Sequence, residues 1–285
     1  MAGLPRGPNV TDIRLLWLGA LLVLAPFLGA AETSEQRVER NSALRLLEAS
    51  GVRGGLIVHL GCGDGKLTAE LAAGERFFVH GLEPDAATVT SAREHIRSKG
   101  ICGRASVEQW TGQTLPYADN LVNLLVAEDL GEVTAAEVIR VLAPGGVALV
   151  SGTGDQRSGI AGENIEIAGA TWTKLVKPWP EEIDEWTHFL HDASGNAVAA
   201  DRRVGAPRRL QWAGGPLWCR SHEYDASLCA MVSAGGRLFY IFDEGPTGIV
   251  DPRIPDRWTL TARDAFSGVL LWKRPVADWG WKAWK

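Results

Sequence analysis

Short apolar runs alternate with amphipathic segments between residues 35 and 151. The spacing of apolar and charged positions predicts helices over 35–49, 66–73, 86–99 and 135–141. Apolar runs predict strands over 56–60, 77–82, 106–110, 121–126 and 147–151. Strands that alternate with helices at this spacing require a parallel sheet covered on both faces. We therefore expect an α/β fold with a doubly wound, mostly parallel sheet.

The first expected strand runs directly into the turn 61–65, which reads Gly-Cys-Gly-Asp-Gly. Glycine adopts backbone conformations closed to other residues and lets a ligand approach without meeting a Cβ, while the helix that follows presents free N–H groups. The second expected strand ends in Glu83, about 20 residues after the glycine turn, where a carboxylate can bind ribose hydroxyls. The pattern predicts a Rossmann-like nucleotide-binding turn.

Four segments resemble the class I S-adenosylmethionine-dependent methyltransferases, in particular the type 11 methyltransferases. They are 61–65, 81–85 (Gly-Leu-Glu-Pro-Asp), 115–120 (Leu-Pro-Tyr-Ala-Asp-Asn) and 137–147 (Glu-Val-Ile-Arg-Val-Leu-Ala-Pro-Gly-Gly-Val). In that family the glycine turn wraps the methionine part of the cofactor and the acidic residue holds the ribose. The resemblance implies S-adenosylmethionine as the cofactor. The cofactor-binding residues that it implies are His59, Gly61, Cys62, Gly63, Gly65, Glu83 and Pro84.

Three places depart from the family pattern. His59 stands where an acidic residue is usual, Trp110 and Thr111 stand where a Gly-Asp pair commonly meets the adenine, and Asn123 replaces a frequent aspartate. A histidine does not accept a hydrogen bond from an ammonium group as a carboxylate does, and charge-assisted bonds are roughly twice as strong as neutral ones. These departures concern the cofactor rather than the fold.

Two acidic residues, Glu128 and Asp129, follow the fourth expected strand. They lie at the carboxyl end of the sheet, where doubly wound proteins bind substrates, and are the candidates for a substrate-facing acid or base. The alternative is that they cap the helix that follows Gly131. Methyl transfer depends mainly on the position of the nucleophile, so the acceptor is not indicated.

The N-terminus predicts a secretory signal peptide over residues 1–31. Two arginines precede the charge-free apolar run 15–28, and the small residues 29–31 precede Glu32. A helix over this run spans about 21 Å, which is short for a bilayer core of about 30 Å. The alternative is a single uncleaved membrane anchor. Both place the rest of the chain in the periplasm or outside the cell.

Charge and cysteine content limit the kinds of partner and metal site that we expect. The chain has 34 acidic and 29 basic residues and no basic run, so no nucleic-acid partner is expected. The four cysteines have no C-x-x-C spacing, so no zinc site is expected. In an oxidising compartment Cys219 and Cys229 pair or remain buried thiols.

A second part follows residue 153, and ten of the twelve tryptophans lie from Trp172 onward. We expect a Rossmann-like domain at 32–153, a connector at 154–205 and a partial all-β propeller blade at 206–285. Four antiparallel strands make one blade, and those expected here span 228–233, 237–243, 258–263 and 269–274.

The segment 260–272 resembles the repeat of β-propellers of the pyrroloquinoline-quinone type, through an alanine strand, an Asp, a Ser-Gly turn and a terminal Trp. The resemblance covers about one blade and implies that Trp272 packs between blades. Because propellers have typically 4 to 8 blades, we expect the chain to be the front part of a longer protein whose remaining blades are its partners. Pyrroloquinoline quinone would be a cofactor only of the full propeller.

A cluster of potential metal ligands comprises His188, His191, Asp192, His222 and Glu223. Histidines three apart on a helix share a face and could bind a metal or relay a proton. We favour a structural role, in which the two histidines of the connector anchor it against the blade, and expect no metal site.

Three functions fit the sequence. The first is an S-adenosylmethionine-dependent methyltransferase-like protein with an unknown acceptor. The second is an exported, non-catalytic Rossmann-like module attached to a propeller. The third is a fragment of a periplasmic quinone-dependent dehydrogenase.

Overall fold

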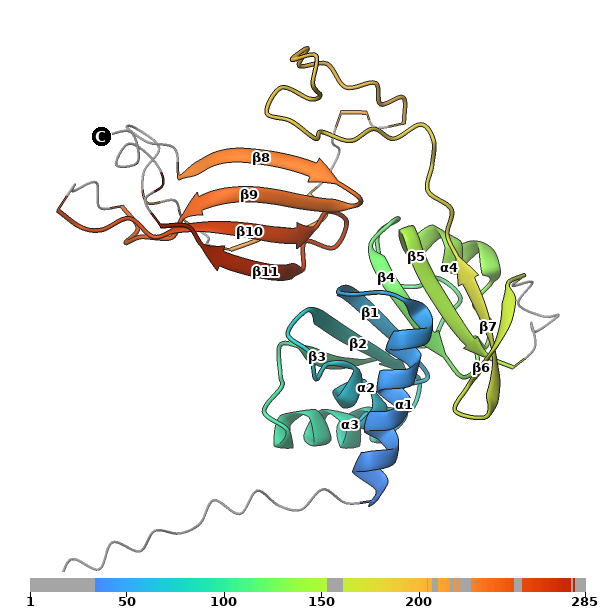
Figure 1. Cartoon of the computed structure of the whole chain (residues 1–285). Helices are drawn as coiled ribbons and strands as arrows, with labels where there is room; N and C mark the ends of the chain where they lie inside the picture. Colours follow the sequence, from blue (N-terminus) through green and yellow to red (C-terminus); the bar gives the residue numbers. More distant parts are fainter. Residues whose placement is uncertain are drawn as a thin grey trace, which may run out of the picture. The chain divides into compact units, whose positions relative to one another are not determined.

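The computed structural model describes residues 34–152, 161–203, 205–206, 210–215, 218, 220, 227–248, 253–277 and 279. Residues 34–285 form one compact unit that contains two β-sheets (Figure 1). The expected signal peptide or anchor over 1–31 lies outside the described residues, as does Cys219. Among the described residues, none of the helices combines the length and the apolar character that a membrane span requires.

The larger sheet has seven strands in the order β3-β2-β1-β4-β5-β7-β6. The first five in this order are parallel, whereas β7 is antiparallel to β5 and to β6. The strands are β1 (Gly55–Leu60), β2 (Phe77–Glu83), β3 (Ala105–Gln109), β4 (Val122–Ala127), β5 (Leu142–Ser151), β6 (Glu163–Ile167) and β7 (Ala170–Val176). The expected Rossmann-like, mostly parallel sheet is confirmed.

Successive residues of the buried strands point to opposite sides of this sheet, so both of its faces are apolar. Helices cover both faces. On one side Ile57 packs in a cluster with α1 (Ser34–Ser50), α2 (Lys66–Leu71) and α3 (Ala86–Ser98). On the other side the neighbouring strand residues pack against α4, which spans Ala135–Val141 (Figure 1). Side-chain caps begin two of these helices. Asp85 accepts a bond from the Thr88 N–H at 2.7 Å, and Thr134 accepts one from the Glu137 N–H at 3.3 Å.

Strand β5 begins earlier than the sequence predicts. Residues 144–146 were expected to separate the helix from a strand starting at Val147, but they lie inside β5. The reason is their pairing with the residue that follows β7, since the Gly145 N–H donates to the Lys177 carbonyl and the Lys177 N–H donates to the Gly146 carbonyl. The helix itself ends at Val141, as expected.

The sequence did not predict the hairpin formed by β6 and β7, which lies in the segment expected as a connector. Its turn consists of Ala168 and Gly169, with φ of 55° and 84°. Two consecutive residues with positive φ form the tight turn whose twist matches that of paired strands. The hairpin extends the large sheet by two strands.

The second sheet has four antiparallel strands in the order β11-β10-β9-β8. They are β8 (Leu228–Ala234), β9 (Arg237–Asp243), β10 (Trp258–Asp264) and β11 (Leu270–Pro275), so the four expected strands are confirmed. Asp264 shapes the last turn, because its carboxylate accepts bonds from the backbone N–H groups of Phe266 and Ser267 at 3.2 and 2.7 Å.

A buried hydrogen bond joins the two sheets. Asn123, at the start of β4, donates its amide to the Asp264 carboxylate at 2.9 Å, and its carbonyl oxygen accepts a bond from the Leu56 N–H at 2.8 Å. The same amide lies against Gly55, where a Cβ would approach the Asn123 Oδ1 to 2.1 Å. An asparagine rather than an aspartate suits this position, because only the amide can donate to a carboxylate.

We expect the substitution Asn123→Asp to lower the free energy of unfolding by about 1–3 kcal/mol, because it removes a buried donor and places two carboxylates together. Chemical denaturation of the full chain measures this difference. The control is Asn123→Asp combined with Asp264→Asn, which restores a donor and an acceptor and should recover most of the loss. Additive losses in the double variant would show that the two side chains are not partners.

Candidate functional site

The candidate site lies at the carboxyl edge of the large sheet. Because β1, β2 and β4 are parallel and adjacent, their last residues Leu60, Glu83 and Ala127 end at the same edge. The turn 61–65 leaves β1 there, and Glu128 follows β4. The residues that the sequence singled out separately are therefore brought to one edge of the sheet.

The three glycines of the turn all have positive φ, of 69° at Gly61, 53° at Gly63 and 77° at Gly65. A Cβ at either of the first two would have no neighbour within 4 Å, so this side of the turn is open. A Cβ at Gly65 would lie 2.9 Å from the Cβ of Ala92 on α3. The first two glycines leave room for a ligand, and the third allows α2 to pack closely on α3.

The carboxylate of Glu83 connects the two strand ends. Its Oε2 accepts a bond from the Gly63 N–H at 2.9 Å, and the residue is only 9% exposed. The neighbouring Pro84 is exposed, and its carbonyl accepts a bond from the Gln109 side chain at 3.1 Å. The bond to Gly63 orients Glu83 at the open side of the turn.

His59 lies below the turn and is 3% exposed. Its Nδ1 is 2.8 Å from the Thr68 hydroxyl on α2. Burial lowers the pKa of His59 to about 4, so the ring is neutral at physiological pH. His59 therefore supports the packing of α2 on β1 and supplies no charge to the site.

Cys62 is also a buried part of the turn rather than a reactive group. Burial, followed by the nearby charge of Glu83, raises the pKa of its thiol to about 12. A Cβ at Gly81 would lie 2.6 Å from the Cys62 Sγ, so the glycine in β2 makes space for the thiol. A protonated, enclosed thiol does not act as a nucleophile.

The two acidic residues after β4 differ in their contacts. Both are exposed, but the Asp129 carboxylate accepts a bond from the Gly131 N–H at 2.9 Å and so closes its own turn. The cap of α4 is Thr134 rather than either of them. Among the described residues no hydrogen bond engages the side chain of Glu128, which leaves it the more available of the pair.

Helix α1 adds acidic groups that the sequence analysis missed. Lys66 lies 2.7 Å from Glu35 of α1 and 2.6 Å from Asp64 of the turn, so the helix passes beside the turn. Burial raises the pKa of Glu39, and the negative charges of Asp64 and Glu128 raise it further. The only signal in the sequence was the spacing of Glu35 and Glu39, which places both on one helix face.

Comparison with known proteins agrees with this geometry. Residues 57–146 match the family model described as a methyltransferase domain. This range contains β1, the glycine turn, Glu83 and α4. Residues 57–146 are therefore similar to a methyltransferase domain.

Two curated relatives illustrate the match. Over 132 residues the chain is 33% identical to the ribosomal protein L11 methyltransferase of Pelotomaculum thermopropionicum, covering 44% of this chain and 41% of that protein. Over 164 residues it is 34% identical to the ubiquinone/menaquinone biosynthesis C-methyltransferase of Yersinia enterocolitica, covering 54% of this chain and 58% of that protein. The chain thus spans about half the length of these relatives. A crystal structure of a SAM-dependent methyltransferase from Aquifex aeolicus is 17% identical, with a TM-score of 0.41 over 50% of this chain and 94% of that one.

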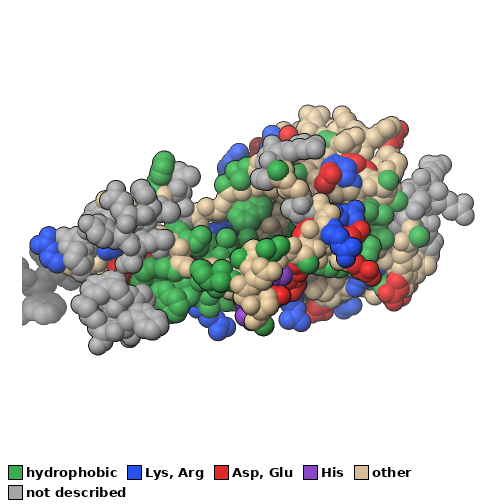
Figure 2. Space-filling view, turned by 90° about the horizontal axis from the view of Figure 1, so that it is seen from above, with side chains coloured by type: hydrophobic (Ala, Val, Ile, Leu, Met, Phe, Trp, Pro, Cys, Tyr) green, Lys and Arg blue, Asp and Glu red, His purple; other side chains and the backbone are tan. Residues whose placement is uncertain are grey.

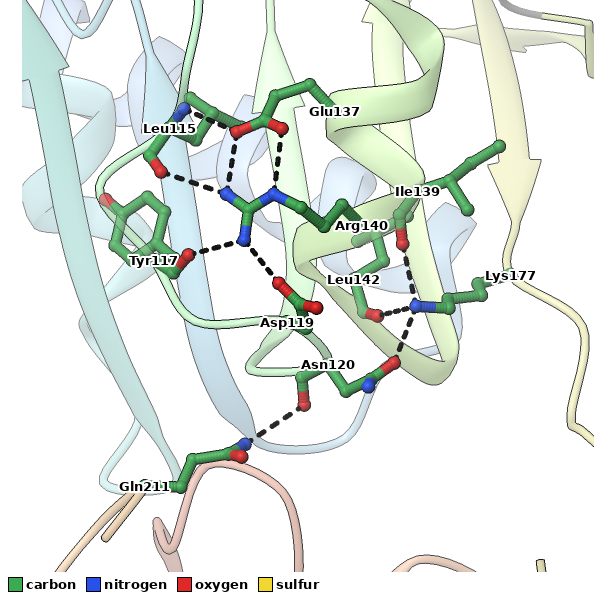
Figure 3. A network of polar contacts seen from close by, with 10 residues as sticks. All are labelled: Leu115, Tyr117, Asp119, Asn120, Glu137, Ile139, Arg140, Leu142, Lys177 and Gln211. Atoms are coloured by element: carbon green, nitrogen blue, oxygen red, sulfur yellow. Dashed lines mark hydrogen bonds and ion pairs between the residues drawn. The ribbon is translucent and has the colours of Figure 1, made fainter. Parts of the chain in front are cut away.

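The two later motifs within residues 57–146 meet around Arg140 (Figure 3). Its guanidinium binds the Glu137 carboxylate in a bidentate pair at 2.7 and 2.8 Å and the Asp119 carboxylate at 2.6 Å. It also donates to the carbonyls of Leu115 and Tyr117. The segments 115–120 and 137–147 therefore belong to one hydrogen-bond network that holds the loop before β4 in place.

Lys177 completes this network from beyond the domain. Its Nζ donates to the Asn120 side chain and to the carbonyls of Ile139 and Leu142, each at 2.7 Å (Figure 3). These carbonyls lie at the end of α4, where a cation stabilises the helix. The network lies before β4, at the other end of the strand from Glu128, and holds the fold rather than the ligand.

Trp110 and Thr111, the residues at the expected adenine position, follow β3. The Trp110 N–H donates to the Glu83 carbonyl at 3.0 Å, and its ring is partly buried against the hydrophobic core on one face of the large sheet. Thr111 is exposed. This hydrogen bond places the backbone of Trp110 next to the backbone of Glu83.

The two histidines of the connector, His188 and His191, do not lie on a helix. His188 and His191 pair in an isolated β-bridge, and His191 has a φ of 71°. The His191 Nε2 lies 2.6 Å from the Asp184 carboxylate, while His222 and Glu223 lie outside the described residues. In the part of the chain that the structure describes, no group of three or more possible metal ligands occurs.

We expect His59 to make stability dependent on pH. Because its folded pKa is about 4 and an ordinary histidine titrates near 6.5, the unfolded state binds a proton in this interval that the folded state does not. Lowering the pH from 6.5 to 4 should therefore cost stability, by up to about 3 kcal/mol from this residue. Denaturation at several pH values measures the slope.

The variant His59→Gln should show a smaller loss of stability over the same interval, whereas the exposed control His188→Gln should keep the full loss. Equal pH dependence in the wild type and His59→Gln would contradict a buried neutral imidazole.

Proposed function

We propose that this chain binds S-adenosylmethionine at the carboxyl edge of its large sheet and transfers the methyl group to an acceptor. The observation that carries the proposal is the bond between the Glu83 carboxylate and the Gly63 N–H, at the open side of the turn. It places a nearly buried carboxylate beside backbone that a ligand can approach directly. The family match of residues 57–146 supports the same conclusion.

The residues present fit such a cofactor. Gly61 and Gly63 leave open space where side chains would otherwise project. Glu83 can accept hydrogen bonds from ribose hydroxyls with the lone pairs that the Gly63 and Asp85 N–H groups do not use. When bound, the cofactor supplies an electrophilic methyl group on a positively charged sulfur.

Acidic side chains around the site suit a cationic ligand. Glu39, Asp64 and Glu128 are close enough for their charges to act on one another, and Lys66 neutralises only part of this charge. The negative potential favours binding of a sulfonium ion over its neutral thioether. This potential takes the place of the single carboxylate that His59 replaces.

Glu128 is the residue we assign as the base toward the acceptor. It is exposed, it follows β4 at the ligand edge, and no hydrogen bond among the described residues holds its side chain. Asp129 is committed to its own turn through Gly131. A carboxylate in this position can accept a proton from an acceptor hydroxyl, amine or activated carbon as the methyl group is transferred.

The acceptor is to be identified by assay, because the relatives' names point to different ones. One is named for ribosomal protein L11 and the other for ubiquinone and menaquinone biosynthesis. A panel of proteins, quinols and small polar acceptors with S-adenosylmethionine labelled on the methyl group distinguishes these classes. Transfer to one class identifies the substrate, and no transfer to any class above the protein-free background would argue against a methyltransferase.

For the second sheet we propose one blade of a β-propeller in an exported protein. Four antiparallel strands and the Asp264 turn support the blade. Figure 2 shows hydrophobic side chains gathered over part of the surface, and Leu228 and Met231 of β8 are 40% and 47% exposed. Further blades would cover such side chains. Binding of pyrroloquinoline quinone would require those blades, and export would depend on residues 1–31.

We expect the variant Glu83→Gln to weaken binding of S-adenosylhomocysteine by roughly tenfold to a hundredfold, because hydrogen bonds to a charged group contribute about 1.5–3 kcal/mol. Isothermal titration of the full chain measures the affinity, and the melting temperature reports whether the fold is intact. The control Glu108→Gln changes an exposed carboxylate on the adjacent strand β3 and should bind like the wild type. Unchanged affinity in Glu83→Gln would refute the proposed site.

Glu39→Gln should distinguish the two forms of the cofactor. Removing one negative charge should weaken binding of the cationic S-adenosylmethionine by about threefold more than binding of the neutral thioether, since partly exposed charges contribute about 0.2–1 kcal/mol. The matched control is Glu48→Gln, near the other end of the same helix. Equal effects on both ligands would exclude a role for Glu39 in recognising the sulfonium charge.

A further inference from the structure

A cavity lies away from the candidate site, within the compact unit 34–285. Its volume is about 440 Å³, in the range of small-molecule sites. It is bounded by the turn before β1, the start of β5 and the hairpins of the second sheet, and Asn123 contributes to its wall from the start of β4. The cavity is therefore at the amino edge of the large sheet, whereas the glycine turn is at the carboxyl edge.

Three arginines line the cavity, and their charge is not balanced. Arg53, Arg76 and Arg237 are exposed, and within the described part of the chain none of their guanidinium groups forms a hydrogen bond or an ion pair. Asp264 is the one acidic residue among the described lining residues. Its carboxylate is occupied by the Asn123 amide and by the backbone of its own turn. The cavity therefore carries a net positive charge that attracts an anion.

Aromatic rings form the rest of the wall. Trp179 and Phe266 meet edge to face, with ring centroids 5.8 Å apart, and Trp272 also lines the cavity. The rings lie close to backbone that has no side chain, since a Cβ at Gly236 would lie 3.2 Å from Trp179 and 3.3 Å from Phe266. Gly236 thus makes room for the rings, and because Trp179 is still 41% exposed its ring is accessible to a flat ligand, whose carboxylate the neighbouring arginines suit.

We propose that this cavity binds a planar aromatic carboxylate. The carboxylate lies against the guanidinium groups of Arg76 and Arg237, and the ring of the ligand lies against Trp179 and Phe266. The site is separate from the proposed cofactor site, so both ligands bind the chain at the same time.

The test uses 2-naphthoate as the probe and the full chain as the protein. Isothermal titration measures its affinity. We expect saturable binding that weakens with salt and falls at least tenfold in Arg76→Gln combined with Arg237→Gln, as loss of charge-assisted bonds requires. The matched control Arg97→Gln removes an exposed arginine of α3 that does not line the cavity, and should leave the affinity unchanged.

A neutral analogue, 2-naphthamide, should bind at least tenfold more weakly, because it keeps the ring and loses the charge. Equal binding of the amide, equal binding by the double arginine variant, or no saturable binding at millimolar 2-naphthoate would each overturn the proposal. Saturating S-adenosylhomocysteine should leave the naphthoate affinity unchanged. Competition would place the probe in the glycine-turn site instead and would refute a separate cavity site without affecting the proposed methyltransferase function.

Discussion

The rest of the structure depends on the turn from β1 into α2, which has glycine at three positions. All three have positive φ, where other residues are strained, and Gly65 also lies too close to Ala92 for a side chain. This turn sets where α2 begins and how α2 packs on α3. It also exposes the Gly63 N–H to Glu83, so the conformation of a few residues couples the packing of the sheet to the geometry of its ligand edge.

The two edges of the large sheet present different chemical groups. At the carboxyl edge, open backbone and acidic side chains form a site suited to a cationic nucleoside. At the amino edge, Asn123 links the sheet to Asp264, and three arginines that have no partner among the described residues line a cavity. The Arg140 network, which also lies before β4, is saturated with internal partners and so stabilises the fold without binding a ligand (Figure 3).

Local patterns were enough to predict most elements of the fold. Helix α4 has the predicted bounds, and the strands of both sheets that were expected differ from prediction by a few residues at their ends, except at β5. The early start of β5 depends on pairing with Lys177, which is distant in sequence. The β6 and β7 hairpin escaped prediction because its turn is Ala168-Gly169, and only the structure shows that an alanine there has positive φ.

The site was predictable as far as the turn and Glu83, because spacing along parallel strands brings them to one edge. The environment of individual side chains could not be predicted from the sequence. Nothing in the sequence shows that His59 is sealed against Thr68, that Glu39 lies near Asp64, or that Asn123 meets a carboxylate 141 residues away. Each of these depends on a contact between segments that are separated in the chain.

The most direct test of the central claim is amide hydrogen exchange of the full chain, with and without saturating S-adenosylhomocysteine. A ligand at the carboxyl edge should slow exchange at residues 61–65 and around Glu83, and should leave residues 145–147 and 235–237 unchanged. Protection confined to those two segments of the amino edge, or no change anywhere, would contradict the account.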